Sequence, residues 1–577
     1  MQAALYTSSG IWLKIKSPAE PEGKRILLNL VSDEGEGGFR AFVNNGELTF
    51  NAEYDATFDR GMKQFVESAI INAEGSVNFA SDYSFTTDIS FVKYSYFNAV
   101  GDGRTDDFDA IIATHEFANK HGLRVEADEG YTYYIGTGAK TAYIKTDVDW
   151  GNATFIIDDR MVNHYNGYRN WVFQAISDSQ SYKLEVPAGM SLPKNVKNIG
   201  ITFDSDVMLQ VFDHTKEIYN RIGESVTNGG EPQSDVIIVH ANGDVDETTP
   251  LLFDFDTVTA ITVQPINDTP ITITGGIFIQ YTNRQPVKSG YFCRGVDIAR
   301  SNTTVYGMEF SFREEADPKK GEPSAAYEAF LRASKACNIL FDSCKMSGRL
   351  CNGQGTYGIQ GDFAINVKWY NCTQLNDITD TRYWGIMGSS GCKNVTYEKC
   401  YLSRFDAHRG LYNASIIDST IGEIINLVGW GTAYLENVTL CAKNSWFIRL
   451  REDYGSIWDG DVIIKNCNFM VKDSFKEAFI LRADWQSHDF GYQVALPNVY
   501  VDGFKVTYES GKDFTGEVYV FKKIHGYPTD IRNDQTNPLR APAEITLKDV
   551  DYNVALVQGT NCEVIFDKTE FKVINDD

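Results

Sequence analysis

The stretch that decides the fold is Val367-Lys-Trp-Tyr-Asn-Cys372. It starts with an apolar residue, has a second apolar residue two positions later, and ends with a polar residue before cysteine. The pattern recurs at Ile339-Leu-Phe-Asp-Ser-Cys344, Val395-Thr-Tyr-Glu-Lys-Cys400 and Val462-Ile-Ile-Lys-Asn-Cys467. Apolar residues that alternate with a period of two are typical of strands with one buried face. The chain is therefore predicted to repeat one kind of strand.

The repeats are unevenly spaced. Segments 415–420 and 433–438 fit the pattern with the cysteine replaced, and equivalent positions along the chain are then 344, 372, 400, 420, 438 and 467. A second short strand is predicted before most repeats, at 329–332, 357–360, 384–387, 409–412 and 447–450. Irregular periods of roughly 20 to 30 residues with short strands indicate stacked coils of a β-solenoid. The cysteines are then interpreted as small apolar residues stacked in a reduced interior column.

Composition narrows the class of protein further. Aromatic residues make up 13% of the 577 residues, and only 15 are proline, which favours strands. No apolar stretch reaches the roughly 18 residues that a membrane span needs, and the N-terminus lacks the basic and apolar segments of a secretion signal. The net charge of −25 argues against binding nucleic acid or anionic membranes. We therefore expect no nucleic-acid partner and no membrane insertion.

The most specific motif is Gly101-Asp-Gly-Arg-Thr-Asp-Asp-Phe-Asp-Ala-Ile111. An amphipathic helix is predicted over 106–120, with Thr105 or Asp106 as its N-cap, followed by strands at 122–126 and from 129 onward. This arrangement resembles the opening motif of the pectate-lyase-like superfamily, which includes phage tailspikes and preneck appendage proteins. The resemblance implies a right-handed parallel β-helix, and it implies that the acids of the motif organise a cap.

A narrower resemblance covers roughly residues 325–485. This region is similar to preneck appendage proteins of the phi29 type, which are homotrimeric virion components that degrade or bind wall teichoic acid or other surface glycans. The resemblance implies a homotrimer that is attached to other virion proteins through its N-terminal region and acts at the host cell surface. It also raises the hypothesis that a C-terminal chaperone has been removed.

The predicted fold class is all-β: a right-handed single-stranded parallel β-helix with a small N-terminal α+β region and a cap helix. Residues 1–90 are expected to form a mixed attachment domain, and 91–137 the cap helix and the start of the β-helix. The β-helix with its glycan site is placed at 138–490, and a C-terminal β region at 491–577.

A candidate glycan site follows from aligning Trp384-Gly-Ile-Met387 with Arg409-Gly-Leu-Tyr412. Parallel stacking then places Thr381 near Asp406 and Tyr383 near His408, about 4.8 Å apart from coil to coil. The candidate catalytic residues are Glu328, Asp377, Asp380, Asp406 and His408. The candidate substrate-binding residues are Arg382, Tyr383, Trp384 and Arg409, joined by Arg451, Arg482 and Trp458 from a second group in which Arg451 is expected to stack on Arg482.

These residue types suit carbohydrate chemistry. Glycoside hydrolysis needs two carboxyl groups that flank the bond, aromatic rings pack on sugar rings, and arginine binds phosphate or carboxylate groups. No cofactor and no metal is expected. Several alternatives remain: the aspartates hydrogen-bond their own turns, His408 is a packing residue, and the second group is a surface ion ladder. A lyase that uses His408 or Arg409, and an adhesin that does not cleave, are the competing functions.

Overall fold

The computed structural model describes most of the chain in two compact units. The first unit contains residues 1–137, 141–158 and 274–277, and the second contains 138–140, 159–273 and 278–577. Within them, the described residues are 26–30, 39–44, 47–52, 60–65, 83–86, 90–136, 138, 140–162, 169–218, 230–266, 268–284, 291–313, 315, 322, 325–350, 356–383, 387–441, 443–451, 454–455, 457–483, 495–521, 544–550 and 555–557.

The first unit begins with a small sheet. Its strands are β1 (Ile26–Leu30), β2 (Phe39–Asn44), β3 (Glu47–Ala52) and β4 (Ser84–Thr86), in the order β1-β3-β2-β4. A short helical segment at 60–65 supplies Met62 and Phe65, which pack with Phe39 and Phe50 in the core. The small α+β region expected at the N-terminus is therefore present in the described residues.

The opening motif forms the next part of the first unit. Its elements are β5 (Phe91–Lys93), η1 (Tyr94–Phe97), β6 (Asp102–Asp106), α3 (Phe108–His121), β7 (Arg124–Glu126), β8 (Thr132–Ile135), β9 (Ala142–Ile144) and β10 (Val148–Asp158). Strand β10 pairs in parallel with β7 and with β8. The helix starts two residues later than predicted. Its N-cap is Asp107, whose side chain makes no capping hydrogen bond.

The acids of the motif are structural, as the resemblance implied. Asp107 is 2% exposed and accepts hydrogen bonds from the backbone N–H of Val100 at 2.6 Å and of Gly101 at 3.2 Å. Asp102 accepts the N–H groups of Arg104 at 2.8 Å and Thr105 at 2.7 Å. These bonds hold the turn before the helix, because a carboxylate satisfies several backbone donors at once.

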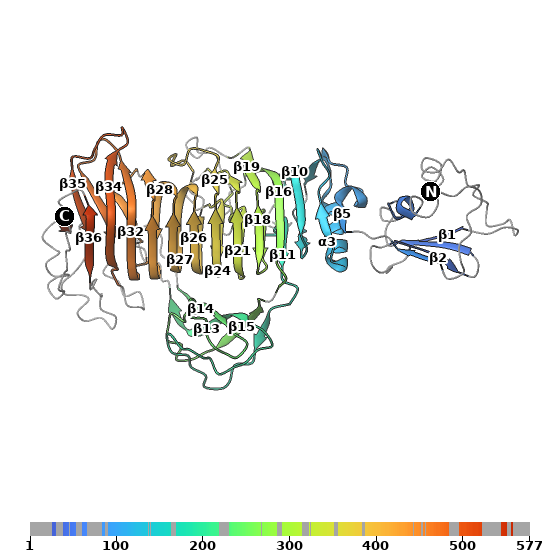
Figure 1. Ribbon diagram of the computed structural model, residues 1–577, viewed down its shortest axis with the longest axis horizontal. Helices are drawn as coiled ribbons and strands as arrows, with labels where there is room; N and C mark the ends of the chain where they lie inside the picture. The colour runs from blue at the N-terminus through green and yellow to red at the C-terminus, as the bar shows by residue number, and fades with distance from the viewer. Residues whose placement is uncertain are drawn as a thin grey trace. The chain divides into compact units, whose positions relative to one another are not determined.

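The second unit is a right-handed parallel β-helix whose coils contain three strands each (Figure 1). The first column of stacked strands contains β11 (Phe173–Ile176), β17 (Val296–Ala299), β20 (Leu331–Ser334), β23 (Ile359–Asp362), parts of β26 (Met387–Glu398), β27 (Tyr401–Ile417) and β28 (Thr420–Leu427), then β31 (Trp446–Leu450), β33 (Glu477–Ala483), β35 (Glu517–Phe521) and β37 (Ala555–Val557). The all-β parallel fold predicted from the sequence is confirmed.

The other two columns complete each coil. The second contains β18 (Thr303–Tyr306), β21 (Cys337–Asp342), β24 (Ile365–Tyr370), the ends of β26 and β27, β29 (Gly429–Glu436), and the starts of β32 (Trp458–Val471) and β34 (Asn498–Tyr508), then β36 (Ile545–Val550). The third contains β19 (Glu309–Arg313), β22 (Lys345–Met346), β25 (Thr373–Gln374), the starts of β27 and β28, β30 (Thr439–Cys441), and the ends of β32 and β34. Strands of the coils thus continue past residue 490.

The interior of the coils is built from stacked identical or similar side chains. Phe341 and Trp369 are level with each other on β21 and β24, and their rings stack at 3.8 Å. Cys344, Cys372 and Cys400 follow one another along the interior, buried and reduced, as the sequence predicted. The Sγ of Cys400 donates to the carbonyl oxygen of Trp369 in the preceding coil at 3.3 Å.

An asparagine ladder fixes the turn between the first and second columns. Asn302, Asn338, Asn366, Asn394 and Asn413 each have a positive φ, from 55° to 59°. From Asn338 onward, each side-chain amide donates to the side-chain oxygen of the asparagine one coil earlier, at 2.9–3.0 Å. Asparagine tolerates the left-handed conformation better than other residues with a Cβ, so it suits this turn.

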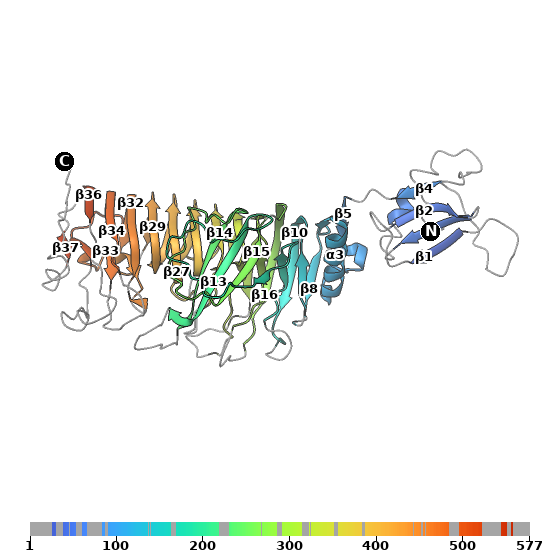
Figure 2. The same ribbon diagram turned by 90° about the horizontal axis from the view of Figure 1, so that it is seen from below.

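An antiparallel sheet interrupts the β-helix, which the sequence did not predict. It contains β12 (Tyr182–Leu184), β13 (Val207–Ile218), β14 (Glu231–Val239) and β15 (Ala260–Pro265), inserted between β11 and β16 (Ile271–Tyr281). Figures 1 and 2 show this inserted sheet on one side of the coils. Its residues Val236 and Ile238 pack on Cys337 and Ile365 of the second column.

The predicted repeats were one residue out of register at one point. Ala414, and not Ser415, is level with Val395 and with Ala433. The repeat is therefore 414–419, with Ser419 in the place of Cys400, because Thr420 is level with Tyr401. None of the helices in the described ranges is long and apolar enough to cross a membrane.

Candidate functional site

Two neighbouring coils pass from the third column to the first without a turn. β27 has only Ser403 between its paired positions Leu402 and Arg404, whereas in the preceding coil residues 375–383 form a turn after β25. In β28 the corresponding residues are Gly422 and Glu423. A Cβ on Gly422 would lie 2.0 Å from the carbonyl oxygen of Ile378, so the preceding turn packs directly against this strand. That contact brings the turn's acids beside β28.

Five charged side chains gather here: Asp377, Asp380, Arg404, Asp406 and Glu423. We call this group the β27–β28 patch. Three of its members were predicted from the sequence, and Arg404 and Glu423 were not. The patch is the place where charged groups of different coils act on one another, so it is the candidate site.

Asp406 lies at the buried side of the patch and has no exposed surface. Its carboxylate accepts hydrogen bonds from Arg451 Nη1 at 3.0 Å, Tyr357 Oη at 3.0 Å and Asn426 Nδ2 at 3.3 Å. Burial by itself raises the pKa of Asp406, but Arg451, Arg404 and His408 outweigh it and lower the pKa below its ordinary value. Asp406 is therefore ionised and its carboxylate is already bonded to three partners, so its predicted role as a catalytic residue in contact with substrate is corrected to a supporting one.

Glu423 has the opposite electrostatic character. It is 6% exposed, and its Oε1 has no hydrogen-bond partner among the described residues. Its nearest cation is Arg404, whose Nη2 lies 3.8 Å from Oε2. Burial raises the pKa of Glu423 to about 7, against the lowering effect of Arg404 and Lys443 and with a further rise from Asp380 and Asp377. A carboxyl group with such a pKa can hold a proton near neutral pH and release it.

The turn after β25 carries the exposed members of the patch. Asp377 accepts hydrogen bonds from the N–H and the hydroxyl of Thr379, both at 2.8 Å. Asp380 accepts bonds from the backbone N–H of Arg382 at 3.0 Å and from its Nε at 2.7 Å. These bonds lower the pKa of both aspartates, so both are ionised above acidic pH. The turn-bonding role that the sequence left open is present, and it leaves both carboxylates near Glu423.

His408 and Arg451 stand beside the patch with two tyrosines. The Nδ1 of His408 lies 3.4 Å from Tyr357 Oη, and its ring packs edge-on against Tyr357 and Tyr454. The guanidinium of Arg451 lies 5.5 Å from the ring centre of Tyr454. His408 and Arg451, both predicted from the sequence, therefore lie beside the buried Asp406. Tyr383 is half-buried beside Gly348, and Trp384 lies outside the described residues.

The predicted stacking of two coils was wrong. Ser390 is level with Arg409, and Lys393 is level with Tyr412, so Thr381 does not stack on Asp406 and Tyr383 does not stack on His408. The error arose because the turn that contains residues 375–383 belongs to one coil only, which changes the spacing between equivalent strands. Arg409 instead forms an ion pair with Glu231 of the inserted sheet.

Glu328 lies away from the patch. Its carboxylate pairs with Arg332 at 2.9 Å and with Arg169 at 3.5 Å. Arg332 in turn bonds Asp297 at 2.9 Å and lies over the Trp171 ring at 4.7 Å. Glu328 therefore belongs to an ion-pair network on β17 and β20, and not to the group of acids with which it was predicted.

The second predicted group is also rearranged. Arg482 is level with Arg449, and not with Arg451, because Leu450 pairs with Ala483. Its guanidinium lies 4.3 Å from the ring centre of Trp446. Trp458 is fully buried, and its Nε1 donates to the carbonyl oxygen of Gly431 at 3.0 Å. A ring enclosed in this way has no face for a sugar, so its predicted role in binding is corrected.

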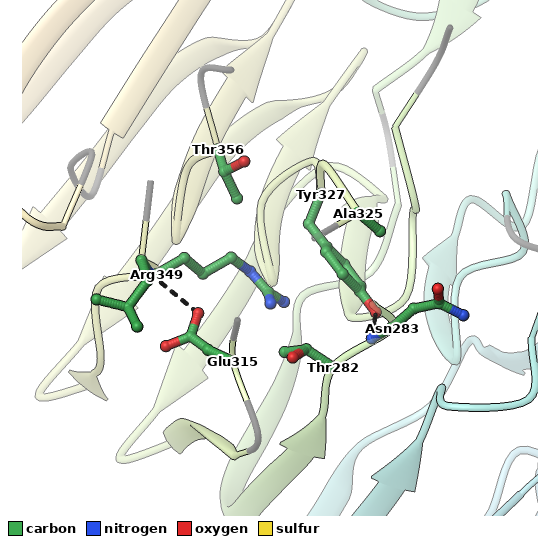
Figure 3. Close-up of a pocket in the computed structure, with 8 residues that line it drawn as sticks. Thr282, Asn283, Glu315, Ala325, Tyr327, Arg349 and Thr356 are labelled. Carbon is green, nitrogen blue, oxygen red and sulfur yellow. Dashed lines mark hydrogen bonds between the residues drawn. The ribbon is translucent and has the colours of Figure 1, made fainter. Parts of the chain in front are cut away.

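A separate small pocket lies among β16, β19 and the turn that follows β22 (Figure 3). Arg349 is 2% exposed and lies between the rings of Phe312 and Tyr327, at 3.6 and 4.0 Å from their centres. Glu315 accepts the backbone N–H of Leu350 at 3.0 Å. Tyr327 donates its hydroxyl to the buried Asp159 at 3.1 Å. None of these residues was a sequence candidate, and they form a closed polar network inside the turns.

Glu315 makes the stability of the protein depend on pH. Burial raises the pKa of its carboxyl to about 7, although Arg349 and the Leu350 N–H lower it. Because the folded state holds the proton more tightly than the unfolded state, this stabilisation is full below the ordinary pKa and is lost as pH rises through about 7. Glu423 acts in the same direction. We expect the melting temperature to fall between pH 5 and pH 8, and Glu315→Gln to reduce that fall. Differential scanning fluorimetry across this pH range measures the fall in melting temperature. If the melting temperature of the variant falls as steeply as that of the wild type, the prediction is wrong.

The residues that sequence reasoning missed had weak signals. Glu423 is the one acid in the apolar run Thr420-Ile-Gly-Glu-Ile-Ile-Asn-Leu427, where the alternation breaks. The short spacing between the neighbouring repeats showed that a turn is absent there. Neither feature identifies a partner, because Arg404 lies 19 residues earlier. Among the described residues, no group of three histidine, cysteine or acidic side chains is arranged to hold a metal ion.

Comparison with known proteins gives partial likenesses. No family model matches the chain. A capsule KL64-specific depolymerase of Klebsiella phage P510 is 31% identical over 146 residues, which is 22% of this chain. The match spans only 13% of the depolymerase's own length. The relative's activity is therefore a basis for proposals about this chain.

Solved structures with a similar arrangement share little sequence. The tailspike protein gp49 of Pseudomonas phage LKA1 has a TM-score of 0.46 and 14% identity, covering 81% of this chain and 83% of that one. The gp54 tailspike of Acinetobacter baumannii bacteriophage AP22, solved with a capsular saccharide, has a TM-score of 0.46 and 13% identity, covering 80% of this chain and 76% of that one. The Streptococcus pneumoniae surface adhesin PfbA has a TM-score of 0.37 and 12% identity over 84% and 98%.

Proposed function

We propose that this chain is a tailspike-type protein of a phage virion that binds and cleaves a host cell-surface polysaccharide at the β27–β28 patch. The observation that carries the proposal is the pairing of a protonatable buried acid with ionised acids in one place. Glu423 retains a proton near neutral pH, while Asp377 and Asp380 are ionised on the turn above it. Hydrolysis of a glycosidic bond uses one carboxyl group of each kind. The likeness to a capsule depolymerase supports the same substrate class.

The chemistry of the patch favours hydrolysis over elimination. A lyase needs a base that removes a proton next to a uronate carboxylate. The candidate bases are less available for that role, because His408 packs between two tyrosines and Arg409 is paired with Glu231. A wall teichoic acid, whose backbone contains phosphodiesters, remains a candidate polymer beside capsular polysaccharide. Arg382, whose side chain is 49% exposed, is a candidate contact for an anionic group on either one.

Incubation of the protein with purified host capsular polysaccharides and wall teichoic acids tests this function, with products identified by mass spectrometry. Saturated oligosaccharides are expected. Unsaturated sugars would show a lyase, and binding without any product would show an adhesin. The double variant Asp377→Asn/Asp380→Asn should lose most of the cleavage. Glu398→Gln is a matched control, because Glu398 is a carboxylate on the second column that pairs with Lys368 at 2.6 Å.

The same proposal includes a virion location, a homotrimer, and attachment through the N-terminal region. Sedimentation equilibrium checks the trimer, since a mass three times that of the chain is expected and a monomer mass excludes it.

A further inference from the structure

Glu423 and the two coils before it carry buried polar atoms that are unsatisfied among the described residues. Its Oε1, the Nε2 of Gln374 and the Oγ of Ser403 are buried without hydrogen-bond partners in the described part of the chain. The three residues lie on adjacent coils, and Gln374 already accepts the backbone N–H of Ser403 at 2.9 Å. Buried polar atoms of this kind are costly unless water or a ligand satisfies them. The arrangement therefore points to a polar ligand group beside Glu423.

Arg404 is shared between two acids of different character. Its Nη1 lies 3.5 Å from Asp406 Oδ2, and its Nη2 lies 3.8 Å from Glu423 Oε2. Asp406 is ionised, so it attracts the guanidinium and keeps it from pairing closely with Glu423. Asp406 is itself held by Arg451, whose Nη1 is 3.0 Å away. The position of the Arg404 guanidinium thus depends on Asp406.

The charges that face Glu423 come from three other elements. Arg404 belongs to β27, Lys443 follows β30, and Asp377 and Asp380 belong to the turn after β25. The two cations favour the ionised form of Glu423, and burial together with the two aspartates favours the protonated form. The second group of effects prevails, so the carboxyl is protonated in a substantial fraction of molecules near neutral pH.

We propose that Glu423 is the proton donor for cleavage at the β27–β28 patch, and that Asp406 is a positioning residue that holds Arg404 away from it. This inference rests on the proposed function. In the step, the Glu423 carboxyl gives its proton to the glycosidic oxygen as the bond from that oxygen to the anomeric carbon breaks. Water adds to the anomeric carbon and gives a proton to an ionised carboxylate, either Asp377 or Asp380. The products are two hydroxyl-bearing sugars, and the proton on that aspartate passes through solvent back to Glu423.

The first test replaces the donor. Glu423→Gln keeps the size of the side chain and removes the titrating proton. We expect kcat to fall by about 10²- to 10⁴-fold, which is the usual contribution of a general acid, while KM stays nearly unchanged. The fall of kcat at high pH, which reports loss of the donor's proton and which we call the basic limb of the pH profile, should disappear. Wild-type-like kcat with the same basic limb in Glu423→Gln would overturn the inference and leave the proposed function standing.

The second test changes the pKa of the donor without removing the donor. Asp406→Asn lets Arg404 pair with Glu423, so the basic limb should shift to lower pH. Arg404→Gln removes the cation, so the limb should shift to higher pH, and this variant supplies the answer if Asp406→Asn fails to fold. A merely structural role for Asp406 and Arg404 would lower activity at every pH and leave the limb in place, which would overturn the positioning role.

The matched control is Glu315→Gln. Glu315 is another carboxyl whose pKa burial raises to about 7, and it lies in the separate pocket of Figure 3. Its replacement should leave the kcat profile unchanged. If wild-type protein cleaves no host polymer, the proposed function fails and the donor role fails with it, which is distinguishable from an active wild type with an unaffected Glu423→Gln.

Discussion

Asp406→Ala should lower the free energy of unfolding by about 3–5 kcal/mol, the usual cost of removing one partner from a buried ion pair. The carboxylate has no exposed surface and accepts bonds from Arg451, Tyr357 and Asn426, which lie on three other segments of the chain. Its removal deprives Arg451 and Arg404 of a counter-charge in a region where water does not replace it. Urea denaturation followed by tryptophan fluorescence measures the loss.

Asp380→Ala is the matched control for this result. Asp380 also pairs with an arginine, but its partner Arg382 is 49% exposed. Exposed ion pairs contribute about 0–1 kcal/mol, so we expect a much smaller loss of stability. Equal losses for Asp380→Ala and Asp406→Ala would show that burial does not set the value of the Asp406 contacts.

Lys393→Met should loosen the inserted sheet from the coils and cost about 3–5 kcal/mol. Lys393 is 1% exposed on β26, and its Nζ donates to Asp235 Oδ2 at 3.0 Å and to the carbonyl oxygen of Pro250. Burial lowers the pKa of Lys393 and raises that of Asp235, and each charge offsets part of the shift in the other. Without the lysine, Asp235 is a buried carboxylate beside Val236 and other apolar side chains.

Limited proteolysis and urea denaturation both report on this change. Cleavage within residues 177–265 should become faster in Lys393→Met. The double variant Asp235→Asn/Lys393→Met should be more stable than Lys393→Met, because the amide carries no charge and its single oxygen still accepts one of the two N–H groups, of Leu252 or Val236, that bond the carboxylate. A double variant that is less stable than the single one would contradict this account of the ion pair.

The repeating strands were predictable because their causes are local. An apolar residue at every second position and a polar residue before cysteine occur within six residues, as in 367–372, and each repeat must bury the same face. The same holds for the opening motif, where Asp102 and Asp107 bond backbone groups only a few residues away. The interior place of Cys344, Cys372 and Cys400 follows from that alternation.

The site was predicted only in part, because its contacts cross coils. A one-residue error in register moves a side chain from one face of a strand to the other, and the extra residues in β28 opposite Ser403 and in β29 opposite Asn413 produce shifts that the pattern conceals. Asp377, Asp380 and Asp406 were found because acids are conspicuous near turns. The inserted sheet was missed because its strands alternate like those of the coils.

The sequence by itself determined the parallel coils and the reduced cysteine interior, because each depends on neighbours within one or two strands. The structural role of the opening acids was implied by the resemblance of their motif. Only the tertiary structure decided which acids meet. Arg404 and Glu423 lie on successive coils, and Asp235 reaches Lys393 across 158 residues. Burial and the charges of those distant partners, rather than the residue type, set the two pKa values. They lower the pKa of Asp406, which stays ionised, and raise the pKa of Glu423, which keeps its proton.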